Sequence, residues 1–218
     1  PAVLATSSAG DIYATGIFSG VIDFGGGVSE SSAGGTDIYL VKLGAGGSAA
    51  DSLRVGGAMS ESPGGVAVSD TGVVLVGAFQ GVVDLGAGDL VSVGGYDGFV
   101  LALAPDLTYD WAEQIAGPGN DVPVRATFDA FGHVVVAGNF EASADLFGAT
   151  LNANGADAFL VKTTAEGTLL WAEQLGGVDE QRLRSLTATD QGNTVVALDF
   201  DTQMTTQSLT LTNGSLND

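Results

Sequence analysis

Cysteine is absent from this sequence of 218 residues, and its absence excludes disulfides, thiol catalysis and thiolate metal sites. Basic residues are also scarce: six Lys and Arg stand against 26 Asp and Glu, so the formal net charge is -20. Such a surface lacks the cations that displace counterions from nucleic acid, and anionic membranes repel it for the same reason. We therefore predict no nucleic-acid binding and no membrane insertion, whereas cations, neutral sugars and basic partners stay open.

Long hydrophobic runs are missing as well, because no stretch of about 18 apolar residues occurs. The chain begins at Pro1 without the basic and apolar segments of a secretory leader, so we expect a mature chain or an excised fragment. Apolar residues nevertheless make up 45% of the sequence, which is enough for a sizeable core at this length.

A repeated phrase is the main feature that the sequence does contain. The residues at 111–117 read WAEQIAG, and sixty positions later those at 171–177 read WAEQLGG. A weaker copy, DSLRVGG, lies at 51–57, with Asp51 in the place of the Trp. Self-similarity at a fixed spacing marks a repeat architecture, so the fold is predicted repeat by repeat.

Each repeat predicts four β-strands joined by short connections, which is an antiparallel meander. A turn glycine precedes the second strand, a β-branched run that ends in Phe. These glycines are Gly10, Gly72, Gly132 and Gly192, and the runs cover 12–18, 73–79, 134–140 and 194–200. The third strand is predicted at 37–43, 97–103 and 157–163, and the fourth is the Trp phrase. Pro63 and Pro123 mark the start of a first strand, where a residue without an N–H is tolerated.

The segment between the second and third strands starts with a shared phrase, such as VIDFG at 21–25 and VVDLG at 82–86. Gly- and Ser-rich sequence of variable length follows it. Because variable length is tolerated best on the surface, we predict that this segment is a surface loop.

The strands at 73–76 and 99–103 are apolar at consecutive positions, so both faces of their sheet must be covered. A four-stranded sheet covered on both faces by copies of itself is the blade of a β-propeller. A parallel β-solenoid would need a shorter repeat, and a β-sandwich would leave the repeat unexplained. We predict an all-β propeller with three full blades and half of a fourth, divided as 1–62, 63–122, 123–182 and 183–218.

Three phrases resemble the bacterial β-propeller repeats known as SBBP repeats: GGTDIYLVKL at 34–43, GVVDLG at 81–86 and LLWAEQLGG at 169–177. The resemblance covers essentially the whole chain. It implies a secreted or cell-surface bacterial protein, and it implies no reaction, because the family has no shared catalytic residues. The chain departs from the pattern at Asp51 and, in the fourth repeat, at Leu198 and Thr205.

Three and a half blades do not close a ring, which typically needs about four to eight. An open strand edge and uncovered end faces favour association with other strands. We therefore expect the chain to be a piece of a longer propeller, or to assemble with another chain that supplies the remaining blades.

The loops between second and third strands and those between blades share one end of a propeller, and here they are rich in acids. Carboxylates and loop carbonyls are the ligands of Ca²⁺, which takes about six to eight oxygens. Asp is also a common turn residue that repetition copies, and we favour this structural interpretation. The candidate ligand residues are Asp23, Glu30, Asp37, Asp84, Asp89, Asp97, Asp121, Asp145, Asp157, Asp179 and Glu180.

Trp111 and Trp171 are possible platforms for sugar stacking, yet their equivalent positions favour packing between blades. The only histidine, His133, is predicted in a turn at the opposite end from the acidic loops, which argues against a Ser-His-Asp site. Glycoside hydrolysis needs two acids about 5–10 Å apart, and a chain with 26 acids satisfies that requirement by chance.

The predicted function is a non-enzymatic, extracellular module that binds a carbohydrate or protein ligand or serves as a scaffold. No cofactor is predicted, and Ca²⁺ is the one candidate metal. The alternative function is a lectin or a glycan-active hydrolase that uses the acidic loop face.

Overall fold

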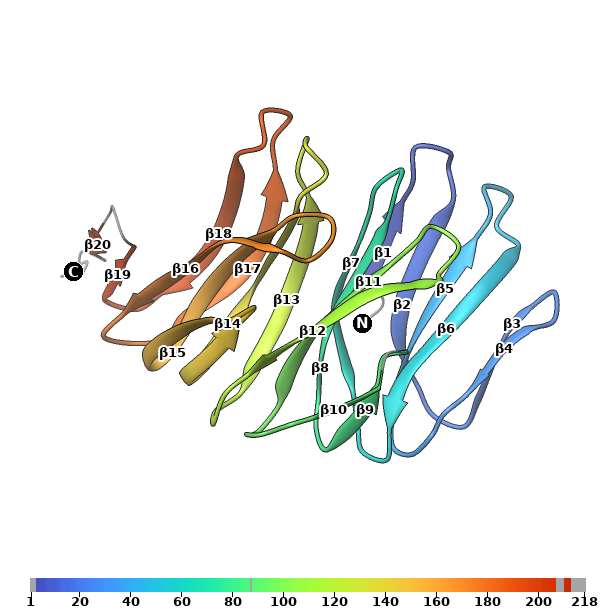
Figure 1. Ribbon diagram of the computed structural model, residues 1–218, viewed down its shortest axis with the longest axis horizontal. Helices are drawn as coiled ribbons and strands as arrows, with labels where there is room; N and C mark the ends of the chain where they lie inside the picture. The colour runs from blue at the N-terminus through green and yellow to red at the C-terminus, as the bar shows by residue number, and fades with distance from the viewer. Residues whose placement is uncertain (1–2, 87, 207–209, 213–218) are drawn as a thin grey trace, which may run out of the picture.

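The computed structural model describes residues 3–86, 88–206 and 210–212, and in these residues the protein is all-β, with 20 strands and no helix. Neighbouring strands pair in antiparallel fashion within the meanders. Figure 1 shows the sheets standing side by side in chain order, from the N-terminal meander to the C-terminal one.

Three four-stranded meanders follow one another, and a pair of strands continues the series. The first consists of β1 (Val3–Thr6), β2 (Ile12–Phe18), β5 (Asp37–Leu43) and β6 (Ala49–Gly57). The second consists of β7 (Ser62–Val68), β8 (Val73–Phe79), β11 (Asp97–Leu103) and β12 (Tyr109–Ala116). The third consists of β13 (Asp121–Phe128), β14 (Val134–Leu146), β15 (Ala149–Thr163) and β16 (Leu169–Gly177), and the pair is β17 (Gln181–Ala188) with β18 (Thr194–Phe200).

The predicted second and third strands are confirmed, because β2, β5, β8, β11 and β18 have the bounds that the sequence pattern predicted. The turn glycines are confirmed as well. Gly10, Gly132 and Gly192 each have a positive φ, which a residue without a Cβ adopts at little cost. Their N–H groups donate to the carbonyls of Ser7, Asp129 and Thr189, and so close the hairpins.

The segment between second and third strands was predicted as a loop, and this prediction was wrong. It forms a further β-hairpin in every repeat. The hairpins are β3 (Val21–Gly25) with β4 (Val28–Ser31), β9 (Val82–Asp84) with β10 (Asp89–Val91), the distal parts of β14 and β15, and β19 (Gln203–Thr205) with β20 (Thr210–Thr212). A repeat therefore contains six strand segments rather than four.

These hairpins join one meander to the next. β9 pairs with the end of β6, β14 with the end of β12, and β19 with the end of β16. A glycine marks each contact: a Cβ built on Gly57, Gly117 or Gly177 would lie within 2.0 Å of a carbonyl oxygen of the incoming hairpin. The Gly at the end of the Trp phrase is therefore required by the approach of the next repeat.

The cores lie between the meanders rather than inside one of them. Every residue of β8 and of β11 is buried, which confirms that both faces of the sheet are covered. One apolar cluster joins the first meander to the second, another joins the second to the third, and a third cluster reaches β17 and β18.

The first strands of successive meanders lie next to one another. β7 contacts both β1 and β13, and β13 contacts β17. The approach is close, since a Cβ on Gly64 would lie 2.1 Å from the carbonyl oxygen of Pro123, and Arg125 Nη1 donates to the carbonyl of Gly64 at 3.2 Å. Pro63 and Pro123 lie inside β7 and β13 at register shifts, where a strand tolerates a missing N–H.

The close approach of the hairpin to Gly117 can be tested by mutation. In Gly117→Val, the new side chain would collide with the carbonyl oxygen of Ser143, which would lie 1.8 Å from a Cβ added at this position. We expect the free energy of unfolding to fall by about 1–3 kcal/mol, the usual cost of overpacking. Urea denaturation followed by circular dichroism measures it.

The control is Gly46→Val, because a Cβ at Gly46 meets nothing within 4 Å. Equal losses in the two variants would show that the hairpin contact does not stabilise the fold.

Candidate functional site

Six of the acids chosen from the sequence fall into two groups of three equivalent residues. Asp23, Asp84 and Asp145 are exposed residues of the hairpins, and their Oδ1 atoms accept the N–H groups of Gly25, Gly86 and Gly148 at 2.8 Å. These three acids therefore form turns, as the structural interpretation held.

A second group lies inside the protein. Asp37, Asp97 and Asp157 begin the third strand of their meanders and are at most 1% exposed. Each accepts a hydrogen bond from the residue seventeen positions later: Arg54 at 2.9 Å, Gln114 at 2.8 Å and Gln174 at 2.5 Å. These carboxylates are therefore buried rather than exposed on the loop face as predicted, and they tie the third strand to the fourth.

The remaining candidates have individual environments. Glu30 Oε1 accepts from the Ser52 hydroxyl at 2.7 Å, Asp179 accepts from Thr202, and Glu180 forms an ion pair with Arg182 at 2.5 Å. Asp89 is exposed on the second hairpin. In the described ranges, no group of three or more His, Cys, Asp or Glu side chains is arranged to hold a metal ion.

A third group, only partly recognised in the sequence, lies where one repeat passes to the next. Glu61, Asp121 and Gln181 occupy equivalent positions at the start of a first strand, and each is at most 2% exposed. Among the described residues, the carboxylate oxygens of Glu61 and Asp121 accept no hydrogen bond of good geometry, although the backbone N–H groups of Gly57 and Glu141 lie near them, and Oε1 of Gln181 has no partner. Only Asp121 was among the candidates, because a charged residue near a loop is ordinarily exposed.

The third copy indicates what this position requires. Gln181 Nε2 donates to the carbonyl of Gln203, in the next hairpin, at 3.2 Å. Asp121 Oδ2 lies in the same place: a Cβ on Gly177 would be 2.9 Å from that Nε2, and a Cβ on Gly117 would be 2.9 Å from that Oδ2. A carboxylate has no proton to donate to the hairpin carbonyl, whereas a carboxylic acid has one.

The pKa values of these two acids reflect the same environment. Burial raises the pKa of Asp121 to about 7, and the negative charges of Asp97 and Glu141 add to the effect. Burial likewise raises the pKa of Glu61 to about 7, together with the charge of Asp37, although Arg54 acts in the opposite direction. Both groups therefore exchange protons near neutral pH.

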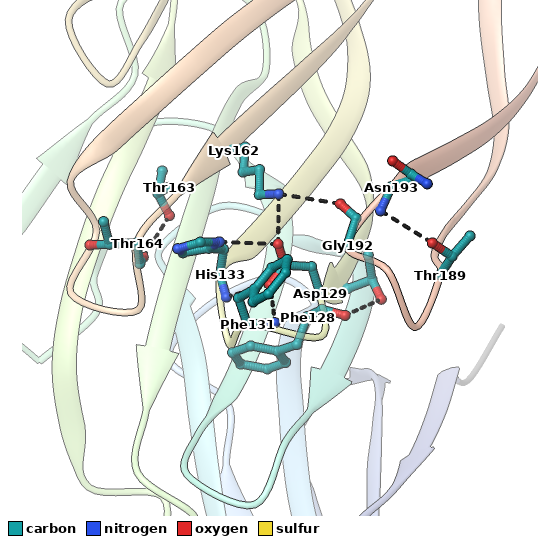
Figure 2. A network of polar contacts seen from close by, with 11 residues as sticks. Phe128, Asp129, Phe131, His133, Lys162, Thr163, Thr164, Thr189, Gly192 and Asn193 are labelled. Atoms are coloured by element: carbon teal, nitrogen blue, oxygen red, sulfur yellow. Dashed lines mark hydrogen bonds and ion pairs between the residues drawn. The ribbon is translucent and has the colours of Figure 1, made fainter.

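The opposite end of the molecule carries a charged cluster around the hairpin turn of the third meander, shown in Figure 2. The buried side chain of Asp129 accepts the N–H groups of Phe131 and His133 through Oδ1. Its Oδ2 contacts Lys162 Nζ at 2.6 Å and His133 Nδ1 at 3.1 Å. Lys162 also reaches the carbonyl of Gly192 at 3.5 Å, in the next turn.

This cluster is an anchor rather than a catalytic dyad. Burial by itself would raise the pKa of Asp129, but the hydrogen bonds from Lys162, from the two N–H groups and from His133 outweigh it and lower the pKa to about 2. The placement of His133 in a turn is confirmed, and its ring is held by the same carboxylate.

The two tryptophans have different surroundings. Trp111 is half-buried, meets Phe147 edge-on at 6.0 Å between ring centroids, and donates through Nε1 to the carbonyl of Ala165 at 2.7 Å. Its packing between meanders is confirmed. Trp171 is 38% exposed, and the packing of this second copy stays a prediction.

A cavity of about 630 Å³ lies beside Trp111 at the turn end, between the second and third meanders. Apolar side chains form its walls, among them Val74, Ala102 and Phe128. Two acids, Asp110 and Glu166, also line it. The volume is typical of small-molecule sites, which are about 300–1,000 Å³.

Comparison with known proteins gives no assignment: no protein-family model matches the chain, and no curated protein matches it. In the described part of the chain, no helix is long and apolar enough to cross a membrane.

The buried acids predict an unusual pH dependence. The unfolded chain releases the protons of Glu61 and Asp121 near their ordinary pKa values of 4.5 and 3.8, whereas the folded protein keeps them until about pH 7. Their contribution to stability is thus full below about pH 4 and is lost as the pH rises through 7.

In Asp121→Asn, an amide supplies the donor at every pH. We expect this variant to be more stable than the parent at pH 8, and to lose most of that advantage at pH 5.

Thermal denaturation at both pH values measures the difference. Asp89→Asn is the control, because it removes the same charge from an exposed position, in the hairpin of the preceding repeat. If Asp121→Asn and Asp89→Asn changed the midpoint equally at pH 8, the buried position would have no special role.

The Asp129 cluster predicts the opposite dependence of stability on pH. Because the folded pKa of about 2 lies below the ordinary value of 3.8, the stability from Asp129 is present above about pH 4 and is lost as the pH falls toward 2. Asp129→Asn leaves Lys162 without its buried counter-ion, so we expect a loss of roughly 3 kcal/mol at pH 7. Urea denaturation measures this loss.

Asp199→Asn is the matched control, since Asp199 pairs with Arg184 at 2.5 Å but both side chains are more than half exposed. Exposed pairs contribute little, so a loss in the control as large as that in Asp129→Asn would contradict the prediction.

Proposed function

We propose that this chain is part of a β-propeller of the SBBP-repeat type, and that it serves as a non-enzymatic binding or architectural module of a secreted or cell-surface bacterial protein. The observation that carries the proposal is the uniform junction. At each of three successive contacts, the hairpin of one repeat adds to the last strand of the repeat before it. A unit that joins its neighbour in one fixed way is suited to a ring or an extended array.

The side-by-side first strands support the radial arrangement. In a propeller the first strands of the blades line the centre, and here β1, β7, β13 and β17 are neighbours. The close approach at Gly64 brings two of them backbone to backbone. The proposed role requires no cofactor.

The outward face of the first meander supports the proposed partner, which is a further repeat from the same longer protein or from another chain. Leu4 is 66% exposed and Ile17 is 53% exposed. Ile22, on β3, is half-buried, whereas its equivalents Val83 and Met204 are 0% and 6% exposed. In the later repeats, the preceding meander covers these equivalent residues. The outward face of the first meander therefore has the shape and composition to accept a preceding meander in the same way.

An extended chain tests the proposal. A duplicate of residues 63–122 is placed directly before Pro1, so that the spacing between repeats is kept. We expect the duplicate to cover the first face and to pair with β3. Hydrogen exchange at the amides of β3 should then slow by at least about tenfold, because they enter a sheet that opens less often.

In a matched control, the copy of Gly117 inside the duplicate is replaced by Val, which blocks the hairpin contact. Unchanged exchange at β3 in the first extended chain, or equal protection in both, would count against the docking of repeats side by side.

A further inference from the structure

The cavity beside Trp111 lies where two large side chains of the first junction are replaced by small ones in the second, although Trp111, in the place of Asp51, occupies part of the space. Tyr13 and Lys42 are paired across β2 and β5, and the equivalent pair across β8 and β11 is Val74 with Ala102. Compared with the first repeat, the second therefore lacks a phenol ring and an aminobutyl chain at this place. Val74 and Ala102 both line the cavity.

The first junction shows what fills this space when the large residues are present. Tyr13 is 1% exposed, and its hydroxyl donates to the carbonyl of Pro105, in the next repeat, at 2.7 Å. Lys42 Nζ donates to the same carbonyl at 3.0 Å and lies 5.6 Å from the centroid of the Tyr13 ring. An aromatic ring and an ammonium group therefore occupy the junction together.

The third junction keeps part of this arrangement. Lys162 is equivalent to Lys42, and it spans from Asp129 to the carbonyl of Gly192 in the next repeat. Of the three junctions in the described residues, the second is thus the one that lacks a lysine at this position.

The walls of this cavity suit an aromatic ring and an ammonium group, the two groups that the second junction lacks. Trp111 and Phe128 offer aromatic surface, and the carboxylates of Asp110 and Glu166 offer negative charge, while no basic residue is among the described side chains that line it. The carbonyl of Ala165 already accepts from Trp111, so a cation there would be held by the carboxylates and the indole face. The net charge of -20 favours the approach of a cation.

We propose that this cavity binds a small molecule that joins an aromatic ring to a protonated amine, a ligand of the arylalkylamine class. The ligand would replace, in the second junction, the ring and the ammonium group that Tyr13 and Lys42 supply in the first. The site depends only on the packing of the second meander against the third, so it goes beyond the proposed architecture and stands whether or not the repeats form a ring.

Tyramine is the probe, because it carries a phenol and a primary amine. Titration calorimetry with the whole chain should show one saturable site with a dissociation constant of roughly millimolar order, as expected for so small a ligand. The ring alone, as p-cresol, and the amine alone, as ethylamine, should each bind at least about tenfold more weakly than tyramine. Equal binding of p-cresol, or no saturable binding of tyramine, would overturn the proposal.

The double variant Val74→Tyr with Ala102→Lys rebuilds the first junction inside the second and should abolish binding. A second variant, Asp110→Asn with Glu166→Gln, leaves the cavity in place and should weaken tyramine binding by about tenfold, with little change for p-cresol. This second variant keeps the test decisive if the filled variant does not fold. Unchanged tyramine affinity in the charge variant, or in a folded filled variant, would place the ligand elsewhere.

Discussion

Burial of both faces of each sheet is the constraint on which the rest of this structure depends. β8 and β11 have no exposed residue, so the second meander is not stable as an isolated sheet and needs a neighbour on each side. The neighbour has the same sequence pattern, and its approach is guided by backbone hydrogen bonds of the incoming hairpin. The absence of a side chain at Gly57, Gly117 and Gly177 follows from that approach.

Once the backbone contacts are fixed, equivalent side-chain positions can change their chemistry without changing the fold. The partner of the buried Asp37 is an arginine, whereas Asp97 and Asp157 have glutamines in its place. The next buried position is an acid in two copies and Gln181 in the third. Charge is therefore compensated differently along the chain: by a guanidinium group together with protonation near neutral pH at the first junction, by protonation alone at the second, and by an amide at the third.

Strands could be predicted from the sequence because their apolar runs are consecutive and their turns are marked by glycine, and the bounds of β2, β5 and β8 follow from these signals alone. The added hairpins could not, since the Gly- and Ser-rich composition of 26–36 is typical of a loop and strand addition depends on a partner distant in sequence. The burial of Asp37 was missed for a related reason: nothing local indicates that a residue seventeen positions later will donate to its carboxylate.

The cavity shows where such prediction can go further. Aligning the repeats places Tyr13 against Val74 and Lys42 against Ala102, and these two differences are readable in the sequence. Their joint effect appears only when the pairing across the strands is known, because the two positions lie side by side on one face. In a repeat protein, agreement between copies describes the scaffold. A coordinated loss of bulk in one copy leaves space that the scaffold does not use, and such a position is therefore the natural place to look for a ligand.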